Sequence, residues 1–208
     1  QMRSVGEVMG IGRTFKESLQ KALLSLEESE LGAYPVVFDE SLLAYPNSKR
    51  VYQVFQAFRE GHSVDEVNGK TQIHPWFLEQ VEELAHFERE LAKETLNADL
   101  LHEAKQKGFS DAAIAKYTGK PVKEVREMRW KNKIVPAYLQ VDTCAGEFKS
   151  ETPYYYSSYH SEQTPANFAQ PMIALLGSGP NRIGQGVEFD YSCVRSVRQF
   201  QKCGKKIA

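Results

Sequence analysis

The stretch from Tyr34 to about Pro136 constrains the fold most, because it carries helix signals with almost no interruption. Glycines and prolines stand where helical hairpins are expected to turn. Pro75 suits a first helical position, and the longest apolar stripe of the chain follows it: Phe77, Leu78, Val81, Leu84, Ala85 and Leu91. We expect this helix to be the spine of a compact bundle of about six to seven helices.

Capping residues predict where the shorter helices begin. Thr14, with Glu17 three residues later, forms the pattern of a capping box ahead of one amphipathic helix. Ser63 with Glu66 repeats the pattern ahead of a helix that we expect to stop at Gly69. A further helix is predicted from Asn47 or Ser48 to about Gly61, with Val51, Phe55 and Phe58 inward. Two shorter helices are predicted from Asn97 to Lys107 and from Ser110 to Tyr117. The last helix of this stretch is predicted from Pro121 onward, with Val122, Val125 and Met128 inward.

Beyond Pro136 the composition changes. Residues 137–142 are extended in character, residues 154–156 are three tyrosines that favour a β-strand, and residues 157–171 form a polar linker. Residues 172–176 then predict a buried strand, followed by a glycine-rich loop and a helix from about Tyr191. The predicted fold class is mainly α, a helical bundle with a small α/β (strand–glycine loop–helix) C-terminal appendage.

The composition limits which binding partners and which cellular compartment we expect for the protein. The net charge of -1 gives no global reason to expect a nucleic acid or a membrane surface, and no run of about 20 apolar residues could cross a bilayer. Cys144, Cys193 and Cys203 lack a C-x-x-C pair, and the five histidines show no zinc spacing. We therefore predict a soluble, cytoplasmic protein without a metal site. Its start lacks the order of a signal peptide, and both ends look cut from something larger.

The glycine-rich loop, residues 177–186, follows a predicted strand and precedes a predicted helix, where backbone N–H groups could hold a phosphate. It departs from the known fingerprints, because Arg182 stands where the dinucleotide motif needs glycine and no Gly-Lys-Ser/Thr is present. The alternative is that the glycines only permit a tight strand-to-helix turn.

Three stretches of the chain resemble one family, in the family's order. Gly177-Ser-Gly-Pro-Asn-Arg-Ile-Gly-Gln-Gly-Val-Glu-Phe-Asp-Tyr191 looks like the opening of the second synthetase half of the carbamoyl phosphate synthetase large subunit. Ser4-Val-Gly-Glu-Val-Met-Gly-Ile-Gly-Arg-Thr-Phe15 resembles the segment that closes the first half. Val141-Asp-Thr-Cys-Ala-Gly-Glu-Phe148 with Thr152-Pro153-Tyr154 resembles the bridge between the halves. The helical middle matches more loosely.

The resemblance implies a division of the chain and a parent reaction. Residues 1–33 would end the first ATP-grasp half, 34–136 form a helical oligomerisation domain, 137–171 form an extended linker, and 172–208 start the second half. The family joins bicarbonate, glutamine-derived ammonia and two ATP into carbamoyl phosphate. ATP and Mg²⁺ (or Mn²⁺) serve the intact parent, and neither ATP-grasp core lies in this chain. The implied partners are a small glutamine amidotransferase subunit and other large subunits in a homo-oligomer.

The resemblance also implies site residues. Arg182, Gly186 and Glu188 occupy the second-half loop that borders the family's interior tunnel, although Glu188 could equally serve in a salt bridge or at a helix terminus. Glu7 and Arg13 lie in the segment that closes the first half and are candidates for the margin of its active site, a solvated turn being the alternative.

An apolar surface of the bundle is expected to meet another large subunit. Its candidates are Phe55, Phe58, Trp76, Phe77 and Phe87, each of which could instead belong to the core. The sequence leaves open a dimer or a tetramer, and an arginine- or pyrimidine-specific parent.

Residues 109–130 suggest the alternative of a nucleic-acid module, because their layout is that of a helix-turn-helix with Gly119 in the turn. From Lys105 to Lys133 nine basic residues stand against three acidic ones. Residues 79–103, however, carry eight acidic and two basic residues. We expect the two segments to neutralise one another, within a subunit or across a two-fold interface, and we predict no nucleic-acid partner.

Overall fold

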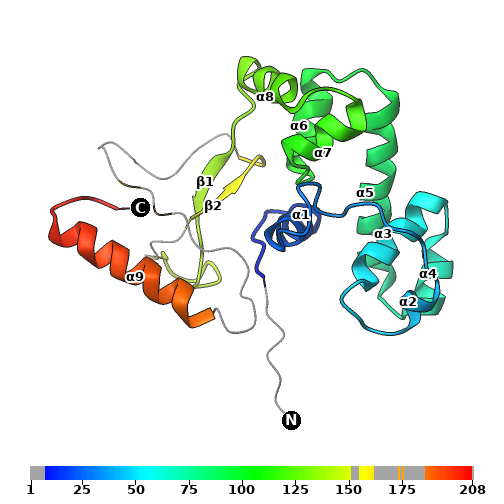
Figure 1. Cartoon of the computed structure of the whole chain (residues 1–208), viewed down its shortest axis with the longest axis horizontal. Helices are drawn as coiled ribbons and strands as arrows, with labels where there is room; N and C mark the ends of the chain where they lie inside the picture. The colour runs from blue at the N-terminus through cyan, green and yellow to red at the C-terminus, as the bar shows by residue number, and fades with distance from the viewer. Residues whose placement is uncertain (1–7, 151–154, 162–172, 174, 176–185, 208) are drawn as a thin grey trace, which may run out of the picture.

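A computed structural model describes residues 8–150, 155–161, 173, 175 and 186–207 of the 208-residue chain. In these ranges the elements are α1 (Phe15–Ser25), α2 (Ser41–Ala44), α3 (Arg50–Glu60), α4 (Val64–Thr71), α5 (Pro75–Lys93), α6 (Ala98–Gln106), α7 (Asp111–Thr118), α8 (Val122–Lys131), β1 (Ala137–Gln140), β2 (Tyr155–Ser158) and α9 (Gly186–Lys202). The predicted fold class, mainly α with a small strand-containing part, is confirmed. Figure 1 shows α2 to α8 grouped on one side, α1 and the strand pair next to them, and α9 beyond the strands.

Local capping explains where the helices of the bundle begin and end. Ser63 and Glu66 form the predicted capping box of α4, in which each side chain bonds the other residue's backbone N–H. Asn97 and Ser110 cap α6 and α7 through their side chains. Gly119 adopts a left-handed conformation (φ 68°) that ends α7 and permits the sharp turn into α8.

The core lies where α5 packs against its neighbours. The long helix α5 contacts α1, α3, α4 and α7, so it is the predicted spine of the bundle. Leu84, Ala85 and Leu91 on its inner face are fully buried. The stripe predicted from helical spacing is therefore confirmed for these positions, and burial of this face provides the main stabilisation of the bundle.

A buried ion pair fastens α3 to α5. The guanidinium of Arg59 donates to both carboxylate oxygens of Glu88 at 2.7 and 2.8 Å, and it also donates to the backbone carbonyls of Ala33 and Tyr34. Burial alone would lower the pKa of Arg59, but the bonds and charge of Glu88 raise it. One charged pair thus joins two helices to the loop that follows α1.

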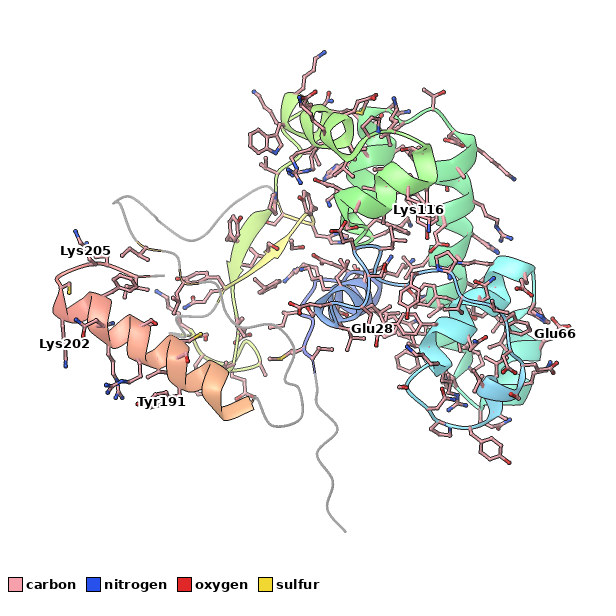
Figure 2. The ribbon with its side chains drawn as sticks, in the orientation of Figure 1. Glu28, Glu66, Lys116, Tyr191, Lys202 and Lys205 are labelled. Atoms are coloured by element: carbon pink, nitrogen blue, oxygen red, sulfur yellow. The ribbon has the colours of Figure 1, made fainter. Side chains whose placement is uncertain are left out.

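The strand pair links the bundle to the C-terminal part of the chain. β1 and β2 run antiparallel, with Ala137 opposite Ser158 and Gln140 opposite Tyr155. Farther along, Ile173 forms a parallel bridge with Ile207, on either side of α9. A parallel bridge across an intervening helix is the connection of a strand–helix–strand unit. The predicted strand at residues 172–176 is described only at residues 173 and 175, and residues 177–185 of the predicted glycine-rich loop lie outside the described residues. Tyr191 and Lys202 lie toward the two ends of α9, whereas Glu66 lies on α4 at the far side of the bundle (Figure 2).

Several predicted details are wrong. The helix that begins at Val64 passes through Gly69 and ends at Thr71, because Gln72 takes the left-handed conformation (φ 57°) that stops it. α9 begins at Gly186, ahead of the predicted Tyr191.

Three further expectations also need correction. α3 starts at Arg50, after the predicted Asn47 or Ser48. Val122 is 38% exposed, because the apolar face of α8 centres on the buried Val125. Ser157 and Ser158 belong to β2 and so are not part of a linker.

Candidate functional site

An aromatic cluster lies on the surface where α5 begins. Phe15 of α1 has its ring centroid 5.5 Å from that of Trp76 and 5.2 Å from that of Phe77. Trp76 and Phe77 are themselves 4.9 Å apart, edge to face. Although they pack on one another, Trp76 is 44% and Phe77 43% exposed. Large aromatic side chains that stay partly exposed are typical anchors of protein interfaces.

An apolar groove continues from this cluster between α1, α3 and α5. Its volume is about 410 Å³, and Leu19, Val51, Ile73 and Phe77 are among the residues that line it. The floor is formed by core residues such as Val54 and Leu78. The cluster and the groove together form one apolar surface, which we call the aromatic surface.

The remaining interface candidates are corrected by the structure. Phe55 and Phe58 are 0% exposed and Phe87 is 3% exposed, so all three fill the core. Phe55 and Phe58 belong to the buried core cluster on α3, and the ring of Phe87 packs against Phe109 with centroids 5.6 Å apart. Only Trp76 and Phe77 of the predicted five present part of their side chains at the surface.

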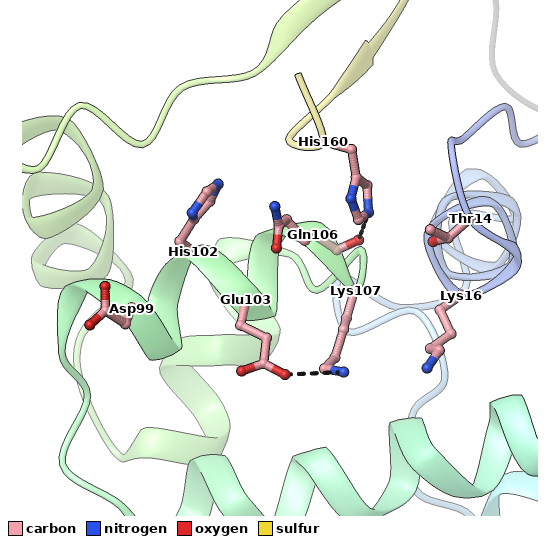
Figure 3. Close-up of a pocket in the computed structure, with 8 residues that line it drawn as sticks. All are labelled: Thr14, Lys16, Asp99, His102, Glu103, Gln106, Lys107 and His160. Atoms are coloured by element: carbon pink, nitrogen blue, oxygen red, sulfur yellow. Dashed lines mark hydrogen bonds and ion pairs between the residues drawn. The ribbon is translucent and has the colours of Figure 1, made fainter. Parts of the chain in front are cut away.

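A polar cavity of about 420 Å³ opens between the start of α1, helix α6 and the residues after β2 (Figure 3). His160 Nε2 donates to the carbonyl of Gln106 at 2.9 Å. Lys107 is paired with Glu103 at 3.2 Å, and Lys16 is paired with Glu83. Burial, and then the nearby charge of Lys107, lower the pKa of Lys16. Both lysines that face the cavity therefore have carboxylate partners within the chain.

The helix-turn-helix layout is present as α7, the turn at residues 119–121 and α8. Some of the cations in and beside it, however, are paired with a carboxylate of the same chain. Asp111 accepts from Lys105 Nζ at 3.0 Å and from Arg129 at 3.2 Å, and Arg126 lies 3.9 Å away. Burial would raise the pKa of Asp111, but Lys105 and Arg129 hold it below its ordinary value. Three of the nine basic residues are thus directed at one carboxylate of the same chain.

Within the described part of the chain, the expected neutralisation between the acidic and basic segments is limited to one ion pair, and neutralisation across a two-fold interface stays a prediction. Among the described residues, the ion pairs of segment 105–133 run chiefly to Asp111 or to carboxylates within α8. One pair, Lys107 with Glu103, joins the two segments. The acidic segment instead reaches α1 through Glu83 and α3 through Glu88.

The structure describes only some of the residues that we predicted to border the tunnel or the active site. Arg182 and Glu7 lie outside the described residues. Gly186 is the first residue of α9, and Glu188 follows on the same helix. Arg13 has an exposed side chain, and its backbone N–H donates to Glu17 Oε2 at 2.7 Å.

A buried carboxylate that the sequence marked only as a cap lies beside Arg13. Glu17 is 1% exposed and bonds Ser158, a residue that is distant in sequence, at 3.1 Å. Its carboxylate does not return to Thr14 as a capping box would require, although the Thr14 side chain does cap α1. The only hint of this site in the sequence was a carboxylate in the first turn of a predicted helix. Its burial depends on tertiary packing, which the sequence does not show.

Within the described ranges, no group of three or more His, Cys, Asp and Glu residues is placed to hold a metal ion. Over the same part of the chain, no helix is both long and apolar enough to cross a membrane. The three cysteines are free thiols.

The fold defines a class of protein: a helical-bundle domain, with an apolar surface, that leads through a strand pair into the opening of an α/β unit. Comparison with known proteins identifies the family. The family described as carbamoyl-phosphate synthetase large chain, oligomerisation domain matches residues 7–133. The family described as carbamoyl phosphate synthase preATP-grasp domain matches residues 169–208.

Curated relatives agree with both matches. The carbamoyl phosphate synthase large chains of Deinococcus radiodurans and Thermotoga petrophila are 48% and 49% identical to this chain, and that of Methanothermobacter thermautotrophicus is 42% identical. Each comparison covers 98% of this chain and 19 to 20% of the relative. The chain therefore belongs to the carbamoyl-phosphate synthetase large-chain family and spans about a fifth of the length of these relatives.

Proposed function

We propose that this chain is the oligomerisation and linker segment of the large subunit of a glutamine-dependent carbamoyl phosphate synthetase. The intact enzyme would make carbamoyl phosphate from bicarbonate, ammonia drawn from glutamine by a small amidotransferase subunit, and two ATP. The family matches in order, oligomerisation domain and then preATP-grasp domain, support this placement. We place the sites for ATP and Mg²⁺ (or Mn²⁺) in the two catalytic halves, so that this segment alone does not turn over.

The aromatic surface is the observation that carries the self-association proposal. Trp76 and Phe77 keep close to half of their area exposed beside an apolar groove, in a domain of the oligomerisation family. Covering this surface with a second large subunit would remove apolar area from water, which is the main driving force of such interfaces. We propose that Trp76 and Phe77 contact the partner subunit.

The other predicted sites remain proposals for the intact enzyme. Arg182, Gly186 and Glu188 are proposed to border the tunnel between the halves, and Glu7 and Arg13 the margin of the first active site. A cytoplasmic location remains a prediction, with which three free thiols agree.

Nucleic-acid binding is the weaker alternative. The helix-turn-helix is formed, but Lys105 and Arg129 are committed to Asp111, and α8 carries Glu124 and Glu127 where phosphates would approach. An acidic partner strand would have to compete with Asp111 for these cations.

The chain's two tryptophans allow a matched test of the proposal. Trp76→Ala removes an anchor of the aromatic surface, whereas Trp130→Ala removes a 68% exposed tryptophan from α8. Sedimentation of the chain across a concentration series should show reversible self-association that Trp76→Ala weakens at least about 30-fold, as loss of an interface hot spot worth about 2 kcal/mol requires.

Trp130→Ala should leave the association constant unchanged. A labelled duplex added in a parallel run should be ignored by all three proteins. Equal weakening by both substitutions, or a monomer that binds the duplex with steep salt dependence, would contradict the proposal.

A further inference from the structure

The Glu17 carboxylate holds together segments that lie far apart in the sequence. It sits on α1 with 1% of its area exposed. Its Oε2 accepts from the backbone N–H of Arg13 at 2.7 Å and from the hydroxyl of Ser158 in β2 at 3.1 Å. Ser158 in turn accepts from the backbone N–H of His160. One carboxylate oxygen thus binds both the segment that enters α1 and the strand pair that follows the bundle.

Lys21 joins the same segments a second time. Its Nζ lies 2.9 Å from Glu17 Oε1, outside the angle of a hydrogen bond, so charge alone holds this oxygen. The ammonium donates to the carbonyl of Ile11 at 2.8 Å and to the carbonyl of Ser157. The incoming segment and β2 are therefore both bonded to Glu17 and to Lys21, one turn apart on α1.

Residues 11–13, which lead into α1, pack closely against the helix at Glu17 and Ser18. A Cβ added at Gly12 would stand 3.0 Å from Glu17 Cγ and 2.9 Å from the backbone nitrogen of Ser18. Only glycine leaves room for this approach without a shift of the helix. The bonds from residues 11–13 to α1 are partly buried, and a hydrogen bond in a less polar surrounding is stronger than one in water.

An ion pair with a buried carboxylate is a poor choice for stability alone. The Glu17 side chain is 1% exposed and that of Lys21 27%, so desolvation falls mainly on the carboxylate and offsets part of the attraction between the two charges. The bundle already holds α3 to α5 with a more deeply buried pair, Arg59 with Glu88, whose bonds reach neither residues 8–13 nor the strand pair. The Glu17 and Lys21 pair differs because its bonds run to both flanking segments.

We propose that Glu17 and Lys21 form a joint that couples the two catalytic halves of the parent enzyme. This inference rests on the proposed function, in which residues 8–13 close the first half and the strand pair leads to the second. Glu17 is a positioning residue in this scheme: it fixes the relative placement of the two flanking segments, and through them the path by which an intermediate passes between the halves.

The test uses the full-length large chain that contains this segment, together with its small subunit. The double variant Glu17→Gln with Lys21→Met removes both charges of the joint, keeps side chains of similar volume and leaves no buried charge unpaired. Its matched control is Arg59→Met with Glu88→Gln, which removes the other buried pair of the bundle. Ser158→Ala, which deletes only the bond between α1 and β2, serves as a milder third variant.

The readout is the number of ATP molecules hydrolysed per carbamoyl phosphate formed, which is two for a coupled enzyme of the proposed kind. When the joint is removed, intermediates formed at the cost of the first ATP are lost before they reach the second half. We expect the ratio to rise at least about 1.5-fold in the joint variant, to rise less in Ser158→Ala, and to stay at two in the control.

Three results would overturn the inference. A ratio of two in the joint variant and in Ser158→Ala means that the joint does not couple the halves. An equal rise in the control means that loss of stability, and not the joint, causes the effect. If the wild-type enzyme forms no carbamoyl phosphate at all, the proposed function itself fails, and the inference fails with it.

Discussion

Asp111→Asn is expected to be among the most damaging single changes at a polar position of the bundle. Asp111 holds Lys105 and Arg129, whose side chains are 9% and 13% exposed, and its own side chain is 14% exposed. Removing one partner of a buried ion pair costs about 3–5 kcal/mol. Lys105 and Arg129 keep bonds to the carbonyls of Phe109 and Ile134, which places the expected loss near the lower end of that range.

A second contribution comes from the position of Asp111 in α7. It is the first residue of the helix, where a negative charge is worth about 0.5 kcal/mol. The total expected loss in the free energy of unfolding is therefore about 3–4 kcal/mol. For a bundle of this size such a loss lowers Tm by about 10–15 °C.

The assay is thermal and urea unfolding followed by far-ultraviolet circular dichroism. Glu124→Gln is the matched control, because it removes a carboxylate whose pair with Lys120 is exposed (30% and 47%) and should cost no more than about 0.5 kcal/mol. A loss below about 1 kcal/mol for Asp111→Asn, or equal losses for the two variants, would refute the assignment of Asp111 as the anchor of α7 and α8.

The pKa of Asp111 is lowered in the folded state. Its stabilising contribution is therefore complete above the unfolded pKa of about 3.9 and is lost as the pH falls through the folded pKa. The difference in unfolding free energy between wild type and Asp111→Asn should shrink below about pH 4 in urea titrations. A gap that stays constant down to about pH 2 would contradict this linkage. Phe58→Ala, at a position that is 0% exposed, should lower the unfolding free energy by about 3–5 kcal/mol while the self-association constant of the folded chain, measured by sedimentation, stays unchanged. If Phe58→Ala weakened self-association without lowering the unfolding free energy, Phe58 would have to be assigned to the interface.

The sequence predicted the parts of the fold that local chemistry determines. The capping box at Ser63 and Glu66 depends only on neighbours within one turn, and so does the left-handed glycine at position 119. The buried stripe of α5 follows from helical spacing over a long run. These features were found because their physical causes lie within a few residues of one another.

The surface was harder to predict, because exposure depends on which neighbours cover a face. Phe77 and Leu78 are adjacent on α5, yet one is 43% and the other 1% exposed. Phe55 and Trp76 were equal candidates in the sequence, and only the packing of α3 on α5 separates them. Periodicity identifies an apolar face and leaves open whether a partner inside or outside the chain covers it.

Polar contacts between residues far apart in the chain could not be predicted from the sequence. The bond from Glu17 to Ser158 joins residues separated by nearly the whole helical bundle. A carboxylate in the first turn of a helix normally faces solvent and serves the helix dipole. Nothing local shows that β2 returns to cover it.

The same limit applies to the helix-turn-helix, because a count of charges does not show where each cation points. A run of cations suggests a surface that tracks phosphates, and this suggestion assumes that the cations point to solvent. Asp111 reverses the assumption, since it stands at the start of α7 and draws Lys105 from α6 and Arg129 from α8 toward the interior. The cations then fasten α6, α7 and α8 to one another. A nucleic acid that recruited them would have to break these contacts and leave Asp111 without its partners, so strong binding of a duplex and a stable bundle are opposing demands on the same three side chains.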